Sequence, residues 1–309
     1  MKTESIFAKK SAVPVWALLC TLLWGSASPC IKLGYSLFQV GSGDSMSQIL
    51  FAGVRFTLAG ILTVLFASLG QKRVIVPKKS SWGMVIALAM CQTVIQYVLF
   101  YVGLAHAPGY KGAMISGMCS FFAILISGLI FKTEKVTALK LVGCAVGFVG
   151  IFLINFNHQT FSFSMSPAGE GALMLSTISY AFSSVLIKKF SSREDPVTLS
   201  GWQFFAGGIF MVVMALVSGG RLNAVSGAAW VLMLYMGALS AVAYSIWGKL
   251  LEYHPVSEVT VFSFGTPVFG TLLSIIILGE GAQIGVLQCI AALVCICLGI
   301  YIVNRQSPD

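Results

Sequence analysis

Long apolar segments divide the chain, and this feature restricts its fold more than any other. An α-helix needs about 20 mostly apolar residues to cross a bilayer. Such segments span approximately residues 13–38, 47–69, 82–104, 108–131, 136–156, 168–190, 197–218, 228–250, 255–278 and 282–303. In lipid, every backbone polar group needs an internal partner, which a helix supplies. We therefore expect an all-α membrane protein with about ten transmembrane helices.

The charged residues support this interpretation. They make up only 9% of the chain, against about a quarter in soluble domains. The net charge of +9 does not indicate nucleic acid, because the basic residues lie in short loops between the apolar segments. Fifteen Lys and Arg residues fall on one side, and only Lys111 and Arg221 fall on the other. This asymmetry predicts a multi-pass protein of the plasma (inner) membrane with both termini in the cytoplasm.

The second half of the chain repeats the order of features found in the first half. Each predicted repeat, residues 12–157 and 167–304, holds about five helices of spanning length. An odd number of spans turns the second repeat upside down, so Glu134 and its counterpart Glu280 fall on opposite sides. Two inverted five-helix repeats are typical of transporters that bind substrate near mid-membrane. The aligned features are Trp24 with Tyr180, Ser28 with Ser184, Lys32 with Lys188, and RFTLAG from Arg55 with QFFAGG from Gln203.

Several motifs together resemble the EamA family of the drug/metabolite transporter superfamily. They are WGSASPCIKLG in the first segment, Arg55-Phe56 in the second, the run from Ala107 to Ile154 with LIFKTE, and HPVSEVTVFSFGTPVFGTLLSIIILGE. The resemblance covers nearly the whole chain. It implies ten helices in two inverted repeats and export of amino acids or related metabolites. One departure is Pro267 in SFGTPVFG, where the first repeat has SFF at Ser120–Phe122; it predicts a kink in one half only.

We therefore expect a secondary transporter that exports small metabolites by alternating access. The alternative is a passive channel or a lipid-moving membrane protein, which an inverted repeat also fits. The expected partners are a small-molecule substrate and the lipid bilayer, and the chain is expected to be a monomer or a weak homodimer. Gly143 and Gly147 form a GxxxG pattern, which we assign to packing within one chain rather than to dimerisation.

Enzyme activity is not expected. Gly41-Ser42-Gly43-Asp44 matches the GxGD of membrane aspartyl proteases, but that chemistry needs a second buried aspartate. The other aspartates are Asp195, in a loop, and Asp309. The chain has no HExxH or GxSxG motif. All eight cysteines lie in apolar segments without a CxxC pair, so we expect no metal site, and we expect no cofactor.

Polar and aromatic side chains inside the spans give the candidate substrate site, because polar groups in lipid tend to mark a pathway. Spacing of i, i+4, i+8 places Trp24, Ser28 and Lys32 on one helix face. The alternatives are lysines that reach the head groups, aromatic residues at the membrane interface and glutamines that join helices. Arg55 is interpreted as structural. The predicted substrate-binding residues are Trp24, Ser28, Lys32, Gln96, Tyr180, Ser184, Tyr244 and Trp247.

Glu258 and His106 are the candidates for proton coupling, because they are the titrating groups nearest the predicted pathway. The sequence places no carboxylate clearly at mid-depth. This favours facilitated movement or weak coupling.

Overall fold

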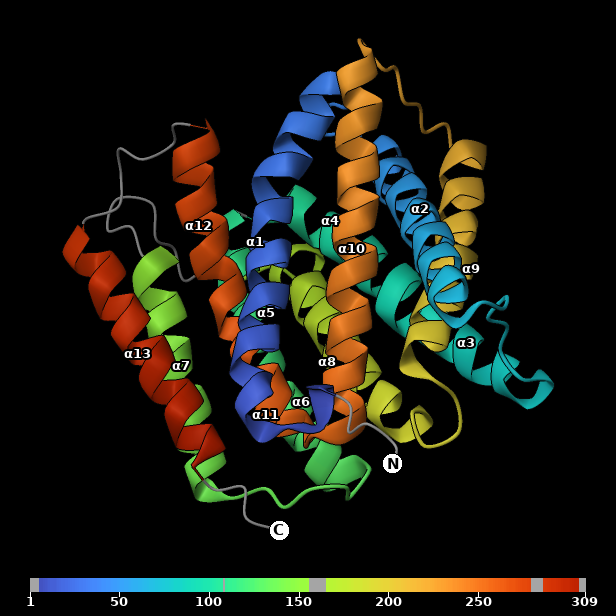
Figure 1. Cartoon of the computed structure of the whole chain (residues 1–309). Helices are drawn as coiled ribbons and strands as arrows, with labels where there is room; N and C mark the ends of the chain where they lie inside the picture. Colours follow the sequence, from blue (N-terminus) through green and yellow to red (C-terminus); the bar gives the residue numbers. More distant parts are fainter. Residues whose placement is uncertain (1–5, 108, 156–164, 279–285, 306–309) are drawn as a thin grey trace.

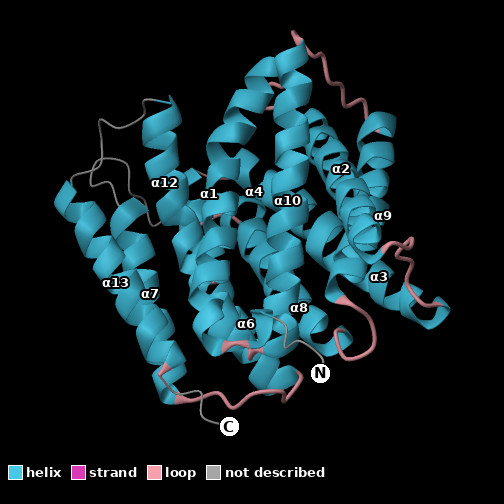
Figure 2. Ribbon diagram, viewed as in Figure 1, coloured by secondary structure: helices cyan, strands magenta, loops and turns pink. Residues whose placement is uncertain are grey.

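The computed structural model describes residues 6–107, 109–155, 165–278 and 286–305. Every regular element within these ranges is helical (Figures 1 and 2). The α-helices are α1 (Val13–Leu37), α2 (Ser45–Gln71), α3 (Trp82–Leu88), α4 (Gln96–His106), α5 (Gly109–Gly117), α6 (Cys119–Leu125), α7 (Ala138–Asn155), α8 (Ala172–Phe190), α9 (Pro196–Val217), α10 (Gly227–Tyr253), α11 (Val256–Thr260), α12 (Gly265–Leu278) and α13 (Val286–Asn304).

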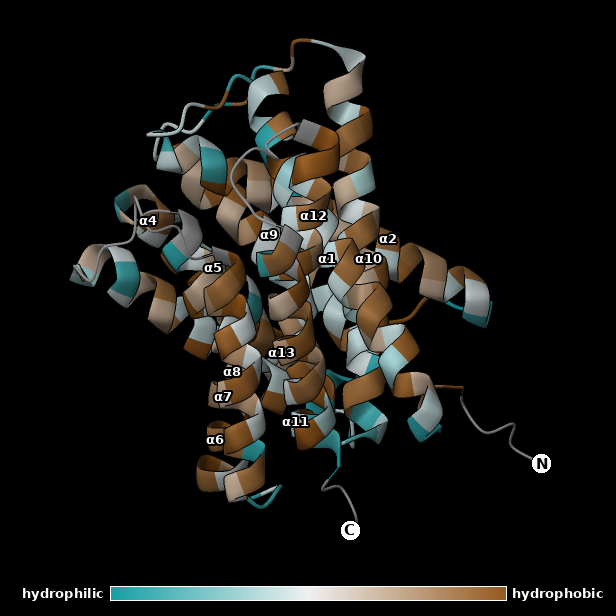
Figure 3. Ribbon diagram, turned by 90° about the vertical axis from the view of Figure 1, so that its left-hand side faces the viewer, coloured by the Kyte–Doolittle hydropathy of each residue, from teal (hydrophilic) through white to brown (hydrophobic). Residues whose placement is uncertain are grey.

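Within the described ranges, eight helical stretches are long and apolar enough to cross a membrane. Two shorter apolar helices, Ala138–Ile154 and Ile290–Asn304, correspond to the remaining two predicted segments. Large apolar side chains such as Phe66, Leu69 and Val217 are exposed, and hydrophobic residues are frequent along the helices of the bundle (Figure 3). Such a surface suits lipid rather than water, so the chain is a multi-pass membrane protein.

The helical spans are interrupted in both halves, so the prediction of a kink in one half only is wrong. In the first half, the chain turns at Met118 between α5 and α6. In the second half, a 3₁₀ segment, Val261–Phe264, separates α11 from α12. Pro267 is not the cause, because it is the third residue of α12, where a missing backbone N–H costs no helical hydrogen bond.

Close helix packing depends on glycines. A Cβ atom on Gly60 of α2 would lie 2.4 Å from the backbone nitrogen of Phe205 in α9, which is too close for any larger residue. On Gly299 of α13, a Cβ atom would lie 2.6 Å from the nitrogen of Gly147 in α7. The GxxxG pattern is therefore used for packing within the chain. Helix α1 packs between α10 and α12, and α8 packs against α4 and α6 (Figure 1).

The start of α1 and the end of α13 lie at the same end of the bundle, which we call the termini side (Figure 1). The loop between α1 and α2 lies at the other end, the opposite side. Glu280 lies outside the described residues.

Candidate functional site

A cavity of about 570 Å³ lies between the two halves of the chain. Side chains from α1, α2, α4 and α5 form its walls together with side chains from α8, α10 and α12. Towards the opposite side it reaches Ser42, in the loop after α1, and Ala105, in the last turn of α4. Both residues are exposed, so the cavity extends from the interior of the bundle to the surface at the opposite side.

Aromatic side chains form the deep end of the cavity, where Trp24, Tyr180 and Tyr244 border the space and Trp247 packs behind Trp24. We call these four residues the aromatic floor. The Trp24 ring centroid lies 5.0 Å from that of Tyr244 and 4.9 Å from that of Trp247. Tyr180 meets Trp24 edge to face at 6.4 Å. Edge-to-face and tilted contacts of this kind are favourable for aromatic rings. They hold Trp24 in place, and its ring borders the empty space.

Some polar atoms on the cavity walls are buried without a partner. Trp24 Nε1, Gln96 Oε1 and Thr266 Oγ1 make no hydrogen bond to any described residue. An unsatisfied buried polar group costs about 1–3 kcal/mol, so native proteins rarely keep several together. The Tyr35 hydroxyl on the same wall is also unpaired within the described part of the chain, and all four atoms have almost no accessible surface, so a polar ligand or water would reach them only after the side chains move.

The structure brings six of the eight predicted substrate-binding residues to this cavity, namely Trp24, Ser28, Lys32, Gln96, Tyr180 and Tyr244. The other two do not line it. Ser184 is buried and donates a hydrogen bond to the Tyr180 carbonyl at 3.2 Å. Trp247 is only 1% exposed and packs behind Trp24. Lys188, the counterpart of Lys32, donates to the Glu252 carbonyl at 3.0 Å on the termini side.

The two glutamines that share a face of the third span have separate roles. Gln92 accepts a hydrogen bond from Gln203 Nε2 of α9 at 3.0 Å, and Thr93 donates to Gln203 Oε1 at 2.8 Å. Gln92 therefore joins helices, whereas Gln96 faces the cavity. A π-helical segment, Ala89–Ile95, lies between α3 and α4 and changes the helical register.

Arg55 is a cavity residue that sequence reasoning assigned to structure alone. It is 3% exposed and lines the cavity from α2. Its Nε and Nη2 atoms both donate to Ser240 Oγ of α10, at 3.1 and 3.0 Å. A cation in the middle of an apolar span is a sequence signal for a functional residue. The sequence did not show, however, that the Arg55 side chain points into the cavity.

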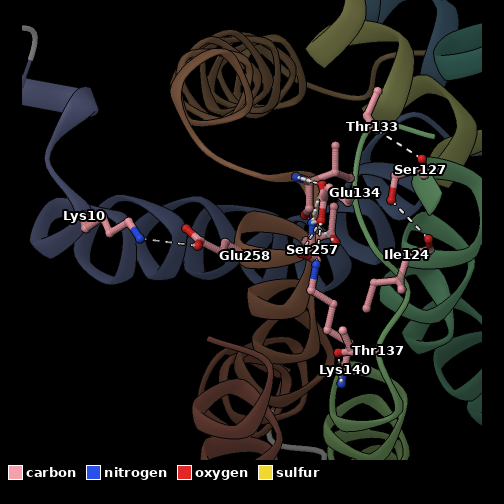
Figure 4. Close-up of polar contacts among 11 residues, drawn as sticks. Lys10, Ile124, Ser127, Thr133, Glu134, Thr137, Lys140, Ser257 and Glu258 are labelled. Atoms are coloured by element: carbon pink, nitrogen blue, oxygen red, sulfur yellow. Dashed lines mark hydrogen bonds and ion pairs between the residues drawn. The ribbon is translucent and has the colours of Figure 1, made fainter. Parts of the chain in front are cut away.

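The coupling candidates lie away from the cavity. His106 is exposed at the end of α4, with Nδ1 2.8 Å from the Val102 carbonyl. Glu258 is buried on the termini side, 3.9 Å from Lys10 Nζ (Figure 4) and 4.0 Å from His254 Nδ1. Neither residue lines the cavity.

Next to Glu258, Glu134 joins the two halves. It accepts hydrogen bonds from the backbone nitrogens of Val256 and Ser257 and from the Ser257 hydroxyl (Figure 4). A carboxylate at the start of α11 satisfies backbone N–H groups that the helix leaves unpaired. Lys140 Nζ binds the same carboxylate at 3.0 Å. We call this group the Glu134 clasp (Glu134, Lys140, Val256 and Ser257).

Comparisons with known proteins agree with this architecture. The model of the EamA-like transporter family matches residues 12–156 and again 167–305. A solved crystal structure superposes with a TM-score of 0.78 at 16% sequence identity, over 97% of this chain and 100% of the other. That likeness concerns the fold.

Three curated relatives illustrate what the chain is similar to. An uncharacterized transporter of Synechocystis sp. is 27% identical, over 92% of this chain and 87% of its own length. An uncharacterized transporter of Archaeoglobus fulgidus is also 27% identical, with 93% and 97% covered. A probable terminal-alkyne amino-acid exporter of Streptantibioticus cattleyicolor is 24% identical, with 88% and 87% covered.

Proposed function

The chain belongs to the EamA-like transporter family, and from the cavity we propose that it exports a small metabolite, an amino acid or a related compound, by alternating access. The family and its relatives are named as transporters, which are not enzymes. One of these relatives is named as a probable amino-acid exporter. The observation that carries the proposal is the cavity itself, with aromatic walls, a few unpartnered polar atoms and a position between the two halves. Small-molecule sites generally have this composition.

We further propose that residues 12–157 and 167–304 are inverted repeats, related by a pseudo-two-fold axis that passes through the cavity. Positions that the sequence motifs align lie against each other in space, as expected for residues close to such an axis. These pairs are Phe56 and Phe204, whose rings stack at 5.2 Å; Ser120 and Ser263, whose Oγ atoms are 3.1 Å apart; and Trp24 and Tyr180, whose centroids are 6.4 Å apart. A repeat of this kind supports two similar states that open to opposite sides.

We assign the termini side to the cytoplasm because of the asymmetric distribution of Lys and Arg. In the plasma membrane the cavity then faces outward. Single cysteines test this on a background without the native cysteines. Ser42→Cys, on the opposite side, should react with an impermeant thiol reagent added to intact cells, whereas Ser80→Cys should not. Both native side chains are exposed, so labelling of Ser80→Cys from outside would reverse the orientation.

Flux into inverted membrane vesicles tests the function. With a panel of amino acids and nucleosides, we expect at least one compound whose rate saturates with concentration, because each molecule must occupy the cavity before the protein changes state. A passive channel would give flux that rises without saturation over the same range. Lipid movement without solute flux would favour the remaining alternative.

A further inference from the structure

Among the residues that the structure describes, the charged side chains on the cavity walls are basic. Lys32 and Arg55 line the cavity, and among the residues that the structure describes no Asp or Glu does so. Lys32 is exposed on α1 near the opposite side, whereas Arg55 is buried in α2. An electrostatic field of this sign attracts small anions and repels cations.

Arg55 lies at the depth expected of a substrate site. It is ten residues after Ser45, where α2 begins, so at about 1.5 Å per residue it lies about 15 Å along the helix. Half of a hydrocarbon core of about 30 Å is a similar length. Ser240 lies near the middle of α10 (Gly227–Tyr253). A permanent charge at this depth needs compensation.

The described contacts of Arg55 do not supply that compensation. Both of its hydrogen bonds go to the single oxygen of Ser240, and Nη1 has no hydrogen-bond partner among the described residues. The neighbouring Phe56 ring, with its centroid 5.1 Å from Arg55 Cζ, offers a cation–π contact but no counter-charge. A guanidinium can bind a carboxylate through two parallel N–H bonds.

We propose that Arg55 is a substrate-binding residue that pairs with a carboxylate, so that the cavity selects small organic carboxylates with an apolar or aromatic body. This inference rests on the proposed transport function and specifies its substrate class. The carboxylate lies between α2 and α10, where Ser240 orients the guanidinium. The apolar body lies against the aromatic floor, beside Gln96 and Trp24 Nε1.

Binding to matched pairs of probes tests the proposal. The purified full-length protein in lipid nanodiscs is titrated with L-phenylalanine, L-leucine, L-tryptophan and 3-phenylpropionate, and with the primary amide of each. The amide keeps the shape and removes the negative charge. Hydrogen bonds to charged groups contribute about 1.5–3 kcal/mol, so at least one acid should bind about 10- to 100-fold more tightly than its amide. If every acid binds no better than its amide, or if no acid binds at all, the proposal is wrong.

Variants connect the selectivity to Arg55. Arg55→Gln should remove the preference for the acid, and Arg55→Lys should retain part of it, because a lysine keeps the charge without the planar fork. Ser240→Ala should weaken acid binding by a smaller factor. Arg221→Gln is the matched control, because Arg221 is exposed and lies outside the cavity; its selectivity should equal that of the wild type. Folding is checked by size-exclusion profile and melting temperature, and Arg55→Lys supplies the test if Arg55→Gln does not fold.

Flux separates the two proposals. Saturable transport of nucleosides or amides, with carboxylates neither bound nor moved, would leave the transport function standing and overturn the role of Arg55. Acid-selective binding that depends on Arg55, without saturable flux of any compound, would support the anion site and contradict transport. An acid preference that survives in Arg55→Gln would assign the selectivity to other residues and overturn the proposal.

Discussion

At the termini side, polar contacts tie the two halves together beneath the aromatic floor, whereas at the opposite side the cavity reaches the surface between exposed side chains. The Glu134 clasp joins the segment after α6 to α11, and His254 Nε2 lies 2.7 Å from the Phe7 carbonyl. At the opposite side, the ion pair between Lys111 and Glu170, with 2.5 Å between Nζ and Oε1, joins the halves at one flank. It does not close the cavity.

This difference between the ends is informative because the two halves of the sequence are similar. If the halves are inverted repeats, a symmetric arrangement would make both ends alike, so the difference between the ends means that the structure represents one of two states. The Glu134 clasp is then an interaction present in this state that must break in the other. A ligand or a mutation shifts such an equilibrium only through its different affinity for the two states, so the contacts at each end are where substitutions should act differently.

The largest effect is expected from Glu134→Gln. Lys140 is 6% exposed, and removing one partner of a buried ion pair costs about 3–5 kcal/mol. Loss of the charge should favour opening at the termini side. A reporter cysteine at Thr260, which is 1% exposed, should then react much faster with a thiol reagent added from that side. In the matched control Glu252→Gln, which removes a carboxylate that binds Lys249 of its own helix, the reporter should stay protected.

Substitutions at the aromatic floor, which lies between the open end of the cavity and the Glu134 clasp, should lower transport activity. Trp24→Ala and Tyr180→Ala remove rings that border the cavity, and each should lower transport per molecule by about tenfold or more, equivalent to about 1.4 kcal/mol. Trp230→Ala is the control, because Trp230 is exposed and outside the cavity. Measuring flux and the amount of membrane protein together separates lost binding from lost folding. Unchanged activity per molecule in both variants would remove this cluster from the substrate site.

Helix caps at the two ends provide a smaller test of stability. Asp44 caps α2 at the opposite side and Asp195 caps α9 at the termini side, each accepting an N–H at 3.0 Å. Asp195 Oδ1 also lies 2.5 Å from Lys249 Nζ. Losing a cap costs about 1 kcal/mol at either end. Asp195→Ala also loses the ion pair with Lys249, so it should lower the melting temperature more than Asp44→Ala. Asn at either position keeps the cap, so Asp195→Asn isolates the effect of Lys249. Equal shifts for the two Ala variants would contradict the comparison.

The stabilising contribution of Asp44 should also depend on pH. Hydrogen bonds from the Ser47 hydroxyl and backbone N–H hold the pKa of Asp44 below its ordinary value. A carboxylate whose pKa is lower in the folded state contributes stability above its unfolded pKa and loses it as the pH falls through the lowered value. The difference in melting temperature between wild type and Asp44→Asn is therefore expected to shrink in acid. A difference that stays constant would exclude this contribution.

The smallest effect is expected from Glu258→Gln. Glu258 lies outside the cavity, and its ion-pair distances to Lys10 and His254 are 3.9 and 4.0 Å. If the protein is a facilitator, the variant should keep wild-type flux within about twofold, a barrier change below 0.5 kcal/mol. Flux assays with and without an imposed pH gradient measure this. Loss of pH-driven accumulation with binding intact would make Glu258 a coupling group.

The positions of the helical spans and of six residues that line the cavity could be predicted from the sequence, because both depend on local patterns. Apolar length sets a span, and i, i+4 spacing places Trp24 and Ser28 on one face. Which face meets the cavity depends on how each helix is rotated by its neighbours. Ser184 shares the spacing of Ser28 but hydrogen-bonds within α8. Arg55 contacts Ser240, and Glu134 caps α11, through hydrogen bonds between residues far apart in the chain. The periodicity of the sequence carries no information about such contacts.

The central claim, that transport requires the two halves to separate at the Glu134 clasp, is tested most directly by a reversible cross-link between Glu134→Cys and Ser257→Cys. The native side chains touch across the clasp, and the pair is not related by the pseudo-two-fold axis, so its distance must differ between the two states. On a background without the eight native cysteines, a bifunctional thiol reagent with a cleavable disulfide should stop flux in the double variant and reduction should restore it, while neither single variant should respond. Undiminished flux through fully cross-linked protein would contradict alternating access and favour a passive channel.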